Sequence, residues 1–474
     1  MVTSDKPLRY IRGNLPRFVS ELRDFVRFPS VSAQPARAGD LKKCAAWLAD
    51  HLKRAGLERV RVFPTKGHPI VYAEWLRAPA RPTVLIYGHY DVVPAEPLEQ
   101  WQSPPFEPAL RGDNLYGRGA SDDKGQMLAH VKALEAYLKT TRALPVNVKC
   151  LFEGEEEIGS PNLTPFIARN RRALKSDVVV MSDTPVLAPG RPAIAYALRG
   201  RLSLELEVTG PKGELHCGNY GGAVHNPLQA LCELIAKLHD AHGRVAIDGF
   251  YDRVRKWSES ERRYMAMSGP VDEQVLRDTK EEVGWGERGY TLYERMTIRP
   301  ALSINGIVGG YQGEGMKAVI PSRAVAKLDF RLVPDQHPRE IELLFRRHIA
   351  RITPPTVHSS VRMITSSPPV LTSRDHPAMR AAARACLKGF GASPVFLRAG
   401  GTISVTNTFQ RMLGVPTVLM GFALPDDNIH APNEKFHLPN FFQGIETCLS
   451  FLNEASAALG DRASAERQRQ ALFV

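Results

Sequence analysis

Residues 83–91, TVLIYGHYD, decide the fold class of this chain. Their first five residues form a short, continuous apolar run, which favours a fully buried strand. A histidine and an aspartate, His89 and Asp91, follow this run almost at once. Because imidazole and carboxylate groups bind or orient metal ions, the end of this strand is a candidate site.

The same arrangement recurs along the chain. Further apolar runs are followed by side chains of the metal-binding type: residues 146–152 by Glu156 and Glu157, 178–181 by Asp183, and 417–420, after ten residues, by His430. Amphipathic helical patterns at 41–52 and 126–139 alternate with the runs, which predicts an α/β layer structure. Open α/β sheets bind ligands at the carboxyl ends of their strands. We therefore expect these side chains to meet at one edge of one sheet.

Asp122 and Asp123 stand instead just before the helix predicted at 126–139. Backbone N–H groups are unpaired at the start of a helix, so carboxylates are favoured there. Asp122 completes a set of five metal-capable side chains with His89, Glu157, Asp183 and His430.

The pattern changes at about residue 193. Leucine and valine then alternate with polar residues at 202–208, which indicates a half-exposed antiparallel strand. An amphipathic helix at 228–238, a polar stretch and a strand at 325–333 follow. We predict an inserted α+β domain at 193–369, between two parts of a discontinuous α/β domain at 1–192 and 370–474.

Composition excludes several classes of protein. A chain of 474 residues is too long for one ordinary core. No apolar stretch approaches the roughly 20 residues that span a membrane, and the first residues lack a signal-peptide core, so we expect a cytoplasmic protein. The six cysteines form no C-x-x-C pair, and most are expected to be buried. The net charge of +12 is spread along the chain without a basic and aromatic platform, so we expect no nucleic-acid partner.

The five side chains fit the chemistry of a two-metal hydrolase. Two nearby divalent ions need a bridging carboxylate, with an imidazole and a carboxylate on each side. A free carboxylate must then move the proton of the attacking water, and adjacent glutamates suit this division of work. Spacing alone does not say which of Glu156 and Glu157 is the ligand. Each motif alone also fits a plain turn or surface residue, but their joint occurrence at strand ends favours a site.

Several motifs then identify a family. The chain resembles the co-catalytic metallopeptidase family that includes carnosine-type cytosolic dipeptidases, carboxypeptidase G, aminoacylase and succinyl-diaminopimelate desuccinylase. The metal-type motifs that carry the resemblance are YGHYDVVP (87–94), LYGRGASDDKG (115–125), FEGEEEIGS (152–160) and SDT (182–184). The dipeptidase branch is the most similar, through HCGNYGGAVHNP (216–227), RPALSINGI (299–307), KAVIPSRAVAKLDFRLVP (317–334), RAGGTISVT (398–406) and IHAPNE (429–434).

The resemblance implies a role for each metal-type residue. His89, Asp122 and Asp183 would bind one metal, and Asp122, Glu157 and His430 the other, with Asp122 as the bridge. Asp91 would orient the imidazole of His89, and Glu156 would be the general base. The resemblance also implies a cis peptide bond between Asp122 and Asp123.

Other implied residues lie in or near the inserted domain. His225 matches a histidine that reaches the active site of the partner subunit and stabilises the oxyanion, which implies a homodimer. Taken alone, His225 fits a capping or surface residue, and His216 is a structural alternative. Arg331 matches the residue that binds the substrate's terminal carboxylate, although a strand-end salt bridge is an equal alternative from the residues alone. Gly400, Gly401 and Thr402 match a substrate-contacting loop.

The chain departs from the family pattern at two places, which limits what the resemblance implies about the substrate. Cys217 stands where the dipeptidases carry serine, and residues 240–300 match only loosely, which leaves the preference for substrate side chains open.

We expect two divalent metal ions per subunit, zinc first, with manganese or cobalt as alternatives. The expected activity is cleavage of a dipeptide or small peptide with a free carboxylate. The alternatives are an N-acyl amino acid deacylase and, on the same fold, a non-catalytic binding protein.

Overall fold

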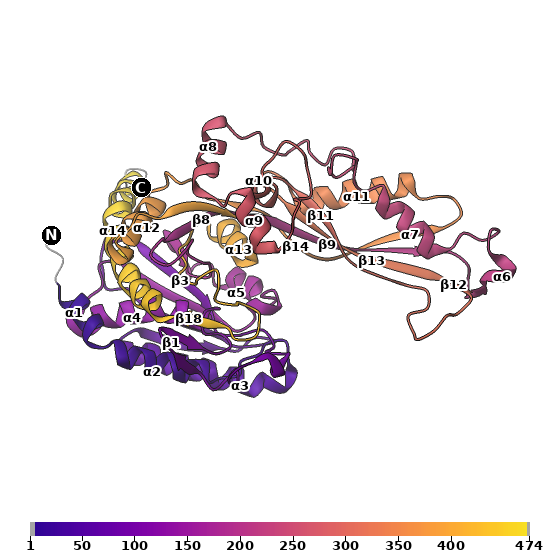
Figure 1. Cartoon of the computed structure of the whole chain (residues 1–474). Coiled ribbons are helices and arrows are strands. Elements are labelled where there is room, and N and C mark those ends of the chain that lie inside the picture. The colour runs from indigo at the N-terminus through magenta and orange to yellow at the C-terminus, as the bar shows by residue number, and fades with distance from the viewer. Residues whose placement is uncertain (1–4, 472–474) are drawn as a thin grey trace. The chain divides into compact units, whose positions relative to one another are not determined.

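The computed structural model describes residues 5–471 (Figure 1) and the side chains of residues 5–460. The chain forms two compact units. The first comprises residues up to Tyr196 together with Thr372–Phe396 and the residues from Thr408 onward, and the second comprises Ala197–Leu371 and Leu397–Asn407. The first unit is discontinuous in sequence. The mixed α/β fold class predicted from the sequence is confirmed.

The first unit is built on a mixed sheet with strands in the order β1-β2-β6-β3-β7-β17-β8. Neighbours β6, β3, β7 and β17 run parallel, whereas β1 and β2 are antiparallel to their partners. The strands are β1 (Glu58–Phe63), β2 (Ile70–Trp75), β3 (Thr83–His89), β6 (Asn147–Glu153), β7 (Val178–Met181), β17 (Thr417–Leu419) and β8 (Ala193–Leu198), with β16 (Val395–Ala399) also pairing β8. A small sheet contains β4 (Ala109–Arg111), β5 (Asn114–Tyr116) and β18 (Lys435–His437).

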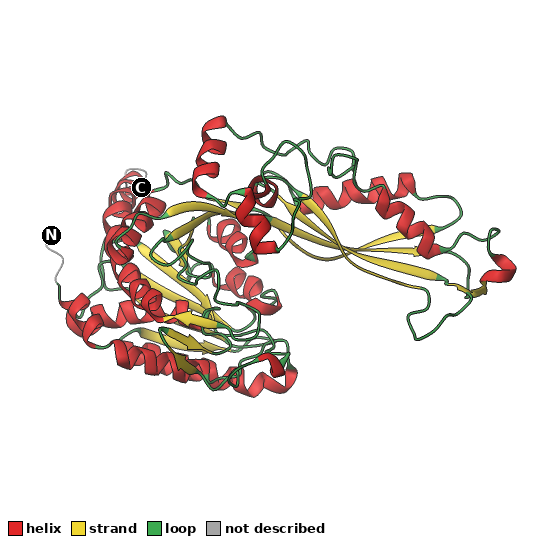
Figure 2. Cartoon of the chain, in the orientation of Figure 1, coloured by secondary structure: helices red, strands yellow, loops and turns green. Residues whose placement is uncertain are grey.

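Helices and short turns of 3-10 helix complete this part of the chain (Figure 2). They are α1 (Lys6–Gly13), α2 (Leu15–Val26), α3 (Ala38–Ala55), α4 (Lys124–Thr140), α5 (Leu163–Asn170), α12 (Pro377–Phe390), α13 (Ser404–Leu413), α14 (Leu438–Ala471), η1 (Pro35–Arg37), η2 (Leu98–Gln100) and η3 (Glu156–Ile158). Helix α14 continues to Ala471, and residues 472–474 lie outside the described part.

Helix α4 is more deeply buried than its sequence pattern predicts. The pattern indicates one apolar stripe through Met127, Val131, Leu134 and Leu138, but every residue of α4 up to Tyr137 is buried. The helix packs against α1, α2, α3, α14 and β3, so neighbours cover most of its circumference. Its polar residues are consequently inside the protein, and a buried ion needs a partner there.

The second unit contains a four-stranded antiparallel sheet in the order β11-β13-β9-β14. Leu202, Leu204, Leu206 and Val208 alternate along β9 and form one core with side chains of β13, α7 and α11. The alternation predicted for residues 202–208 therefore marks the buried face of this sheet. The elements are β9 (Gly200–Thr209), β10 (Leu215–His216), β11 (Ala301–Gly309), β12 (Val319–Ile320), β13 (Arg323–Leu332), β14 (His358–Ser367), β15 (Val370–Leu371), α6 (Cys217–Tyr220), α7 (Pro227–Ala236), α8 (Glu259–Ser268), α9 (Asp272–Thr279), α10 (Leu292–Thr297) and α11 (Pro338–Ile352).

The polar stretch around residues 240–300 contains three helices that the apolar pattern did not reveal. Two of them, α8 and α10, contribute Met265 and Tyr293 to a small core with Ile298. Ser258 caps α8 by accepting the N–H of Glu261, and Thr291 forms a capping box with Glu294 at the start of α10. Both starts follow the S/T-x-x-E pattern, which was the available signal for these helices.

Among the described residues, no helix is long and apolar enough to cross a membrane. Four of the six cysteines, namely Cys44, Cys150, Cys386 and Cys448, are buried, as expected. Cys217 and Cys232 are exposed.

Candidate metal centre

The carboxyl ends of four adjacent parallel strands carry most of the metal-type side chains. His89 is the last residue of β3, and Asp183 lies two residues beyond β7. Glu156 and Glu157 form η3 just after β6, and His430 follows β17 in a longer loop. Because parallel strands end at the same edge of a sheet, the four loops leave from one side. Asp122 comes from the segment before α4, and its peptide bond to Asp123 is cis, as the resemblance implies.

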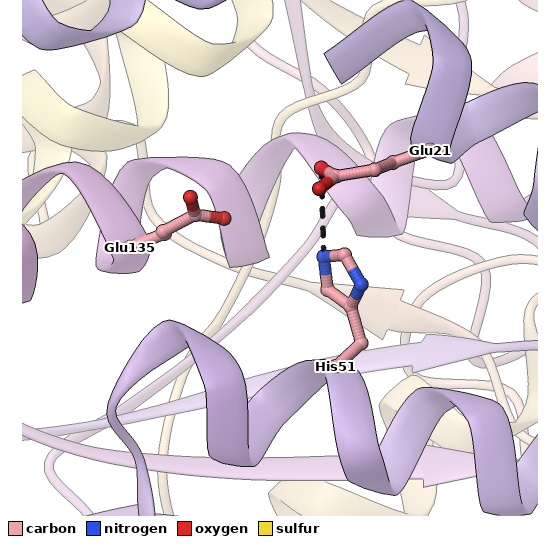
Figure 3. A group of neighbouring side chains, drawn as sticks. All are labelled: Glu21, His51 and Glu135. Carbon is pink, nitrogen blue, oxygen red and sulfur yellow. Dashed lines mark ion pairs between the residues drawn. The ribbon is translucent and has the colours of Figure 1, made fainter. Parts of the chain in front are cut away.

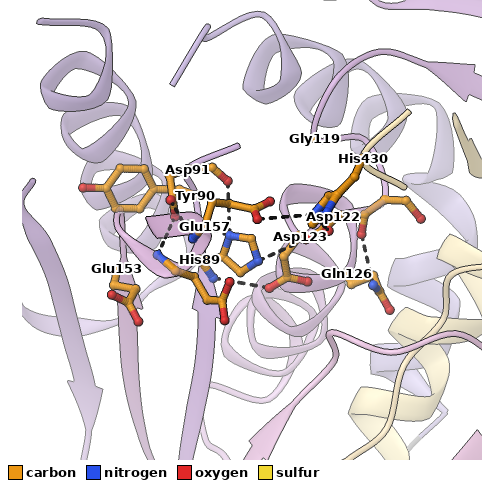
Figure 4. Close-up of polar contacts among 12 residues, drawn as sticks. His89, Tyr90, Asp91, Gly119, Asp122, Asp123, Gln126, Glu153, Glu157 and His430 are labelled. Atoms are coloured by element: carbon orange, nitrogen blue, oxygen red, sulfur yellow. Dashed lines mark hydrogen bonds and ion pairs between the residues drawn. The ribbon is translucent and has the colours of Figure 1, made fainter. Parts of the chain in front are cut away.

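The carboxylate of Asp122 lies between two imidazoles (Figure 4). Its Oδ1 atom is 3.1 Å from Nε2 of His89, and its Oδ2 atom is 3.0 Å from Nε2 of His430. The same Nε2 atom of His430 is 3.2 Å from Oε2 of Glu157. Each oxygen of Asp122 therefore faces a different imidazole, which is the arrangement that a bridging carboxylate requires.

Two groups of three possible ligands share Asp122. His89, Asp122 and Asp183 form one group, and Asp122, Glu157 and His430 form the other, with the ligand atoms of each group within 4.8 Å of one another. These are the two sets that the resemblance implied. Imidazole nitrogens and carboxylate oxygens are donors that suit zinc, manganese and cobalt.

Hydrogen bonding at His89 fits a metal ligand. The imidazole is fully buried, and its Nδ1 atom is 3.1 Å from the carbonyl oxygen of Asp91 and 3.4 Å from its carboxylate Oδ1. Its Nε2 atom lies 3.1 Å from Oδ1 of Asp122, but the two atoms do not form a well-aligned hydrogen bond. A metal-bound histidine commonly donates from one ring nitrogen to a fixed partner and binds the ion through the other. The environment of His89 has that form.

The electrostatics of this group indicate a shortage of positive charge. Burial raises the pKa of Asp183 well above its usual range, and the nearby charge of Asp122 acts in the same direction. Burial likewise raises the pKa of Glu156 to about 7, with a smaller contribution from Glu157. Hydrogen bonds to Asp122 and Glu157 raise the pKa of His430 to about 10. Several carboxylates are crowded here around two imidazoles, and bound cations would relieve their repulsion.

Asp91 connects His89 to the candidate base. Its two carboxylate oxygens accept the backbone N–H groups of Glu156 and Glu157, at 3.2 Å and 3.1 Å. The buried carboxylate thus contacts the imidazole of His89 and the first residues of η3 at once. It fixes the position of the segment that carries both glutamates.

Glu434 is a further residue of this site that the sequence did not single out. Its Oε1 atom accepts the N–H groups of Ser121 and Asp122, at 2.9 Å and 3.1 Å. Its Oε2 atom accepts the N–H of Gly119 and a guanidinium N–H of Arg118, both at 2.8 Å. The buried carboxylate therefore holds the loop that presents Asp122. Glu434 ends the IHAPNE motif, but a lone glutamate after a turn carries no sign of such a role.

A third group of possible ligands in the first unit differs from the other two. Glu21, His51 and Glu135 approach one another closely (Figure 3). The ammonium group of Lys132, which is fully buried, donates to Oε2 of Glu135 at 2.9 Å and also contacts Glu21 and Nε2 of His51. Arg17 pairs with both glutamates, at 2.8 Å and 2.6 Å. The cations of this group, Lys132 and Arg17, belong to the chain itself.

The other predicted residues belong to the second unit. Nδ1 of His225 is 2.8 Å from the hydroxyl of Thr356, and its Nε2 is 3.5 Å from the carboxylate of Glu233. Nε of Arg331 pairs with Asp329 at 3.0 Å, and its Nη1 donates to Thr402 at 3.2 Å. Gly401 is exposed, next to Thr402. His216 accepts a backbone N–H at the start of α6, in keeping with the structural alternative.

Comparisons with known proteins agree with this geometry. The model of peptidase family M20/M25/M40 matches residues 85–454. The Cys-Gly metallodipeptidase of Schizosaccharomyces pombe is 31% identical over 96% of this chain and 98% of its own length. The human Beta-Ala-His dipeptidase is 32% identical over 95% of this chain and 92% of its own.

Solved structures give the same result. An M20 family metallo-carboxypeptidase from Sulfolobus solfataricus aligns with a TM-score of 0.83 and 34% identity, over 93% of this chain and 99% of that one. Human carnosine dipeptidase 1 aligns with a TM-score of 0.81 and 30% identity, over 96% of this chain and 98% of that one.

Proposed function

This chain belongs to peptidase family M20/M25/M40, and from that premise we propose that it is a two-metal dipeptidase that cleaves small peptides with a free carboxylate. The observation that carries the proposal is Asp122, whose two oxygens face the imidazoles of His89 and His430. Asp183 and Glu157 complete the two proposed ligand sets. The Cys-Gly and Beta-Ala-His dipeptidases match nearly the whole chain, as does the Sulfolobus solfataricus carboxypeptidase, and all three names indicate peptide substrates, which supports a dipeptide over an N-acyl amino acid.

Each residue of the centre has a proposed task. Two divalent ions held there, zinc first and manganese or cobalt as alternatives, would polarise the scissile carbonyl and lower the pKa of a water molecule. Glu156 takes the proton of that water and passes it to the leaving nitrogen. Asp91 keeps Nδ1 of His89 occupied and holds the segment of Glu156 through backbone N–H groups. The ligand and the base are thereby attached to one buried carboxylate.

The second unit supplies the proposed contacts to substrate. It is proposed as the lid and dimerisation domain, with His225 acting on the active site of a partner subunit. Arg331 would bind the terminal carboxylate through a guanidinium fork, beside Gly401 and Thr402. Its Nε and Nη1 atoms already have partners in Asp329 and Thr402, which fixes the plane of the guanidinium. The expected cytoplasmic location stays a prediction.

The base is tested with Glu156→Gln, which keeps the size of the side chain and removes its proton affinity. We expect the metal content to stay as in the wild type and kcat on a Cys-Gly or β-Ala-His dipeptide to fall by about 10²–10⁴-fold. The control is Glu99→Gln, at an exposed glutamate. Activity of Glu156→Gln near that of the wild type would remove Glu156 from its role. Hydrolysis of N-acetyl or N-succinyl amino acids, but of no dipeptide, would favour the deacylase.

The dimer is tested by mixing two inactive variants. In a heterodimer of Glu156→Gln and His225→Ala chains, one active site has an intact base and receives an intact histidine from the other chain. Random exchange should restore about a quarter of wild-type activity. Heterodimers that form but stay inactive would contradict action in trans. A sedimenting species that is an active monomer would contradict the dimer itself.

A further inference from the structure

The loop Gly400–Thr402 in the second unit is held by Arg199 from two directions. Nε of Arg199 donates to the carbonyl oxygen of Gly400 at 3.1 Å, and Thr402 Oγ1 donates to the carbonyl oxygen of Arg199 at 2.6 Å. The backbone N–H of Arg199 also donates to the carbonyl oxygen of Ala399, at 3.3 Å. A Cβ atom on Gly400 would lie 2.6 Å from the carbonyl oxygen of Met296 and 3.1 Å from Nη2 of Arg199. The close approach therefore depends on glycine at this position.

The hydroxyl of Thr402 has both of its functions occupied. It donates its proton to the carbonyl of Arg199 and accepts Nη1 of Arg331 at 3.2 Å. A hydroxyl has one proton to give. Thr402 thus orients the guanidinium of Arg331, and the backbone carbonyl of residue 199 in turn orients Thr402, while the Arg199 side chain holds the neighbouring Gly400.

Positive charge exceeds negative charge in this cluster. Asp329 pairs with Nε of Arg201 at 2.7 Å and with Nε of Arg331 at 3.0 Å. The guanidinium of Arg199 donates only to backbone carbonyls among the described residues, those of Gly400 and, at 3.3 Å, Arg295. Burial lowers the pKa of Arg199 to about 10, and the charge of Arg331 adds to this. Arg199 is still charged at neutral pH, and an anion near both guanidiniums would offset their repulsion.

A purely structural role is the competing explanation. Arg295 lies near the end of α10, where the last carbonyl oxygens of a helix lack partners and a cation is favourable. On this explanation, stabilising the end of α10 is the whole role of the Arg199 side chain. That role would explain the bond to Arg295 but not the second side-chain bond, from Nε to the carbonyl oxygen of Gly400.

We propose that Arg199 is a positioning residue that sets the Gly400–Thr402 loop and, together with Arg331, makes it a site for the carboxylate of the substrate. This inference rests on the proposed dipeptidase function. It assigns Thr402 the task of aligning Arg331 rather than donating to the substrate. The specificity for a free carboxylate then depends on two arginines and the hydroxyl between them.

The test compares a dipeptide with the same dipeptide carrying a C-terminal amide. Arg199→Met should raise KM for the acid by about 10- to 100-fold, because the loop loses a hydrogen bond from a charged donor and the carboxylate loses a nearby positive charge. It should leave kcat for the acid, and both constants for the amide, near the wild-type values. Arg199→Lys keeps the charge but cannot reach both carbonyl oxygens, so a smaller rise is expected. The control is Arg362→Met, which removes an exposed guanidinium that pairs with Glu205 on the sheet that also carries Arg331.

The outcomes separate this inference from the proposed function. Equal losses for acid and amide, or no change in KM, would overturn the role of Arg199. Thermal melting identifies a variant that fails to fold. If Arg199→Met does not fold, the KM of Arg199→Lys for the acid and for the amide tests the role of Arg199 instead. If the wild type hydrolyses neither dipeptide, the proposed function fails, and calorimetric binding of the acid and the amide to the metal-free protein still tests Arg199. If Arg199→Met lowered the affinity for the acid and for the amide equally in this calorimetric experiment, the inference would also be contradicted.

Discussion

The first unit contains two places where histidine and carboxylates crowd together, and only one of them has the form of a metal centre. The group of Glu21, His51 and Glu135 meets the same distance criterion as the two groups that share Asp122. The ammonium of Lys132 contacts all three of its members. Around Asp122 no lysine or arginine takes that place among the described ion pairs. The kinds of donor atom therefore say less about whether a group binds a metal ion than does the presence or absence of a lysine among its ion pairs.

The pKa values of the two regions support the same distinction between a group with its own cation and a group without one. In the lysine group, burial raises the pKa of Glu135, but Lys132 and Arg17 together more than offset this and the pKa is lowered to about 2. Burial, with the charge of Lys132, lowers the pKa of His51 to about 3. In the metal centre the pKa of Glu156 is raised to about 7 and that of His430 to about 10. The first group is balanced as it stands, and the second needs positive charge.

Removing the lysine should produce the largest change in stability. Lys132→Met leaves the buried carboxylate of Glu135 and the partly buried one of Glu21 with only Arg17 as a cationic partner, so we expect the free energy of unfolding to fall by about 3 kcal/mol. Urea unfolding of the metal-free protein measures it, with Lys139→Met, at the end of the same helix, as control. Metal content should not change. Loss of bound metal in a folded Lys132→Met protein would show that the two regions are not independent.

Glu434→Gln tests the support of the metal centre without touching a ligand. The amide group of glutamine has one acceptor atom, so two of the four hydrogen bonds at Glu434 are lost and the loop before Asp122 loosens. We expect metal affinity to fall by about 10- to 100-fold, as for other groups that orient ligands. Competition with a chromophoric chelator measures this. An unchanged affinity would remove Glu434 from the site.

A further prediction concerns the pH dependence of stability. Because the pKa of His51 is lowered to about 3 in the folded protein, the unfolded chain binds a proton that the folded chain does not between about pH 6.5 and 3. Stability is fully present above pH 6.5 and falls as the pH drops toward 3, by about 1.4 kcal/mol per pH unit from this group. Urea unfolding of metal-free His51→Gln at pH 5 and 7 should show a correspondingly smaller difference than the wild type. An equal difference would mean that His51 is protonated in the folded state.

The sequence predicted the parts of the site that lie directly beyond strands. His89 and Asp183 are fixed by the strand that precedes each of them, so their meeting at one sheet edge could be inferred from apolar runs. The bridging role of Asp122 needed the family resemblance, because the segment before a helix can take many paths. Glu434 and Lys132 could not be found, since their roles come from partners far away in sequence. The fully buried state of α4 escaped the pattern for the same reason.

The number of metal ions per chain tests the central claim most directly. We predict that wild-type protein equilibrated with excess zinc and then freed of unbound ion holds two per chain by elemental analysis, both at the centre around Asp122. Asp122→Asn, which removes the charge shared by the two ligand groups, should hold fewer than two. Three tightly bound ions in the wild type would mean that Lys132 does not close its group to metal. One ion or none would contradict the two-metal centre.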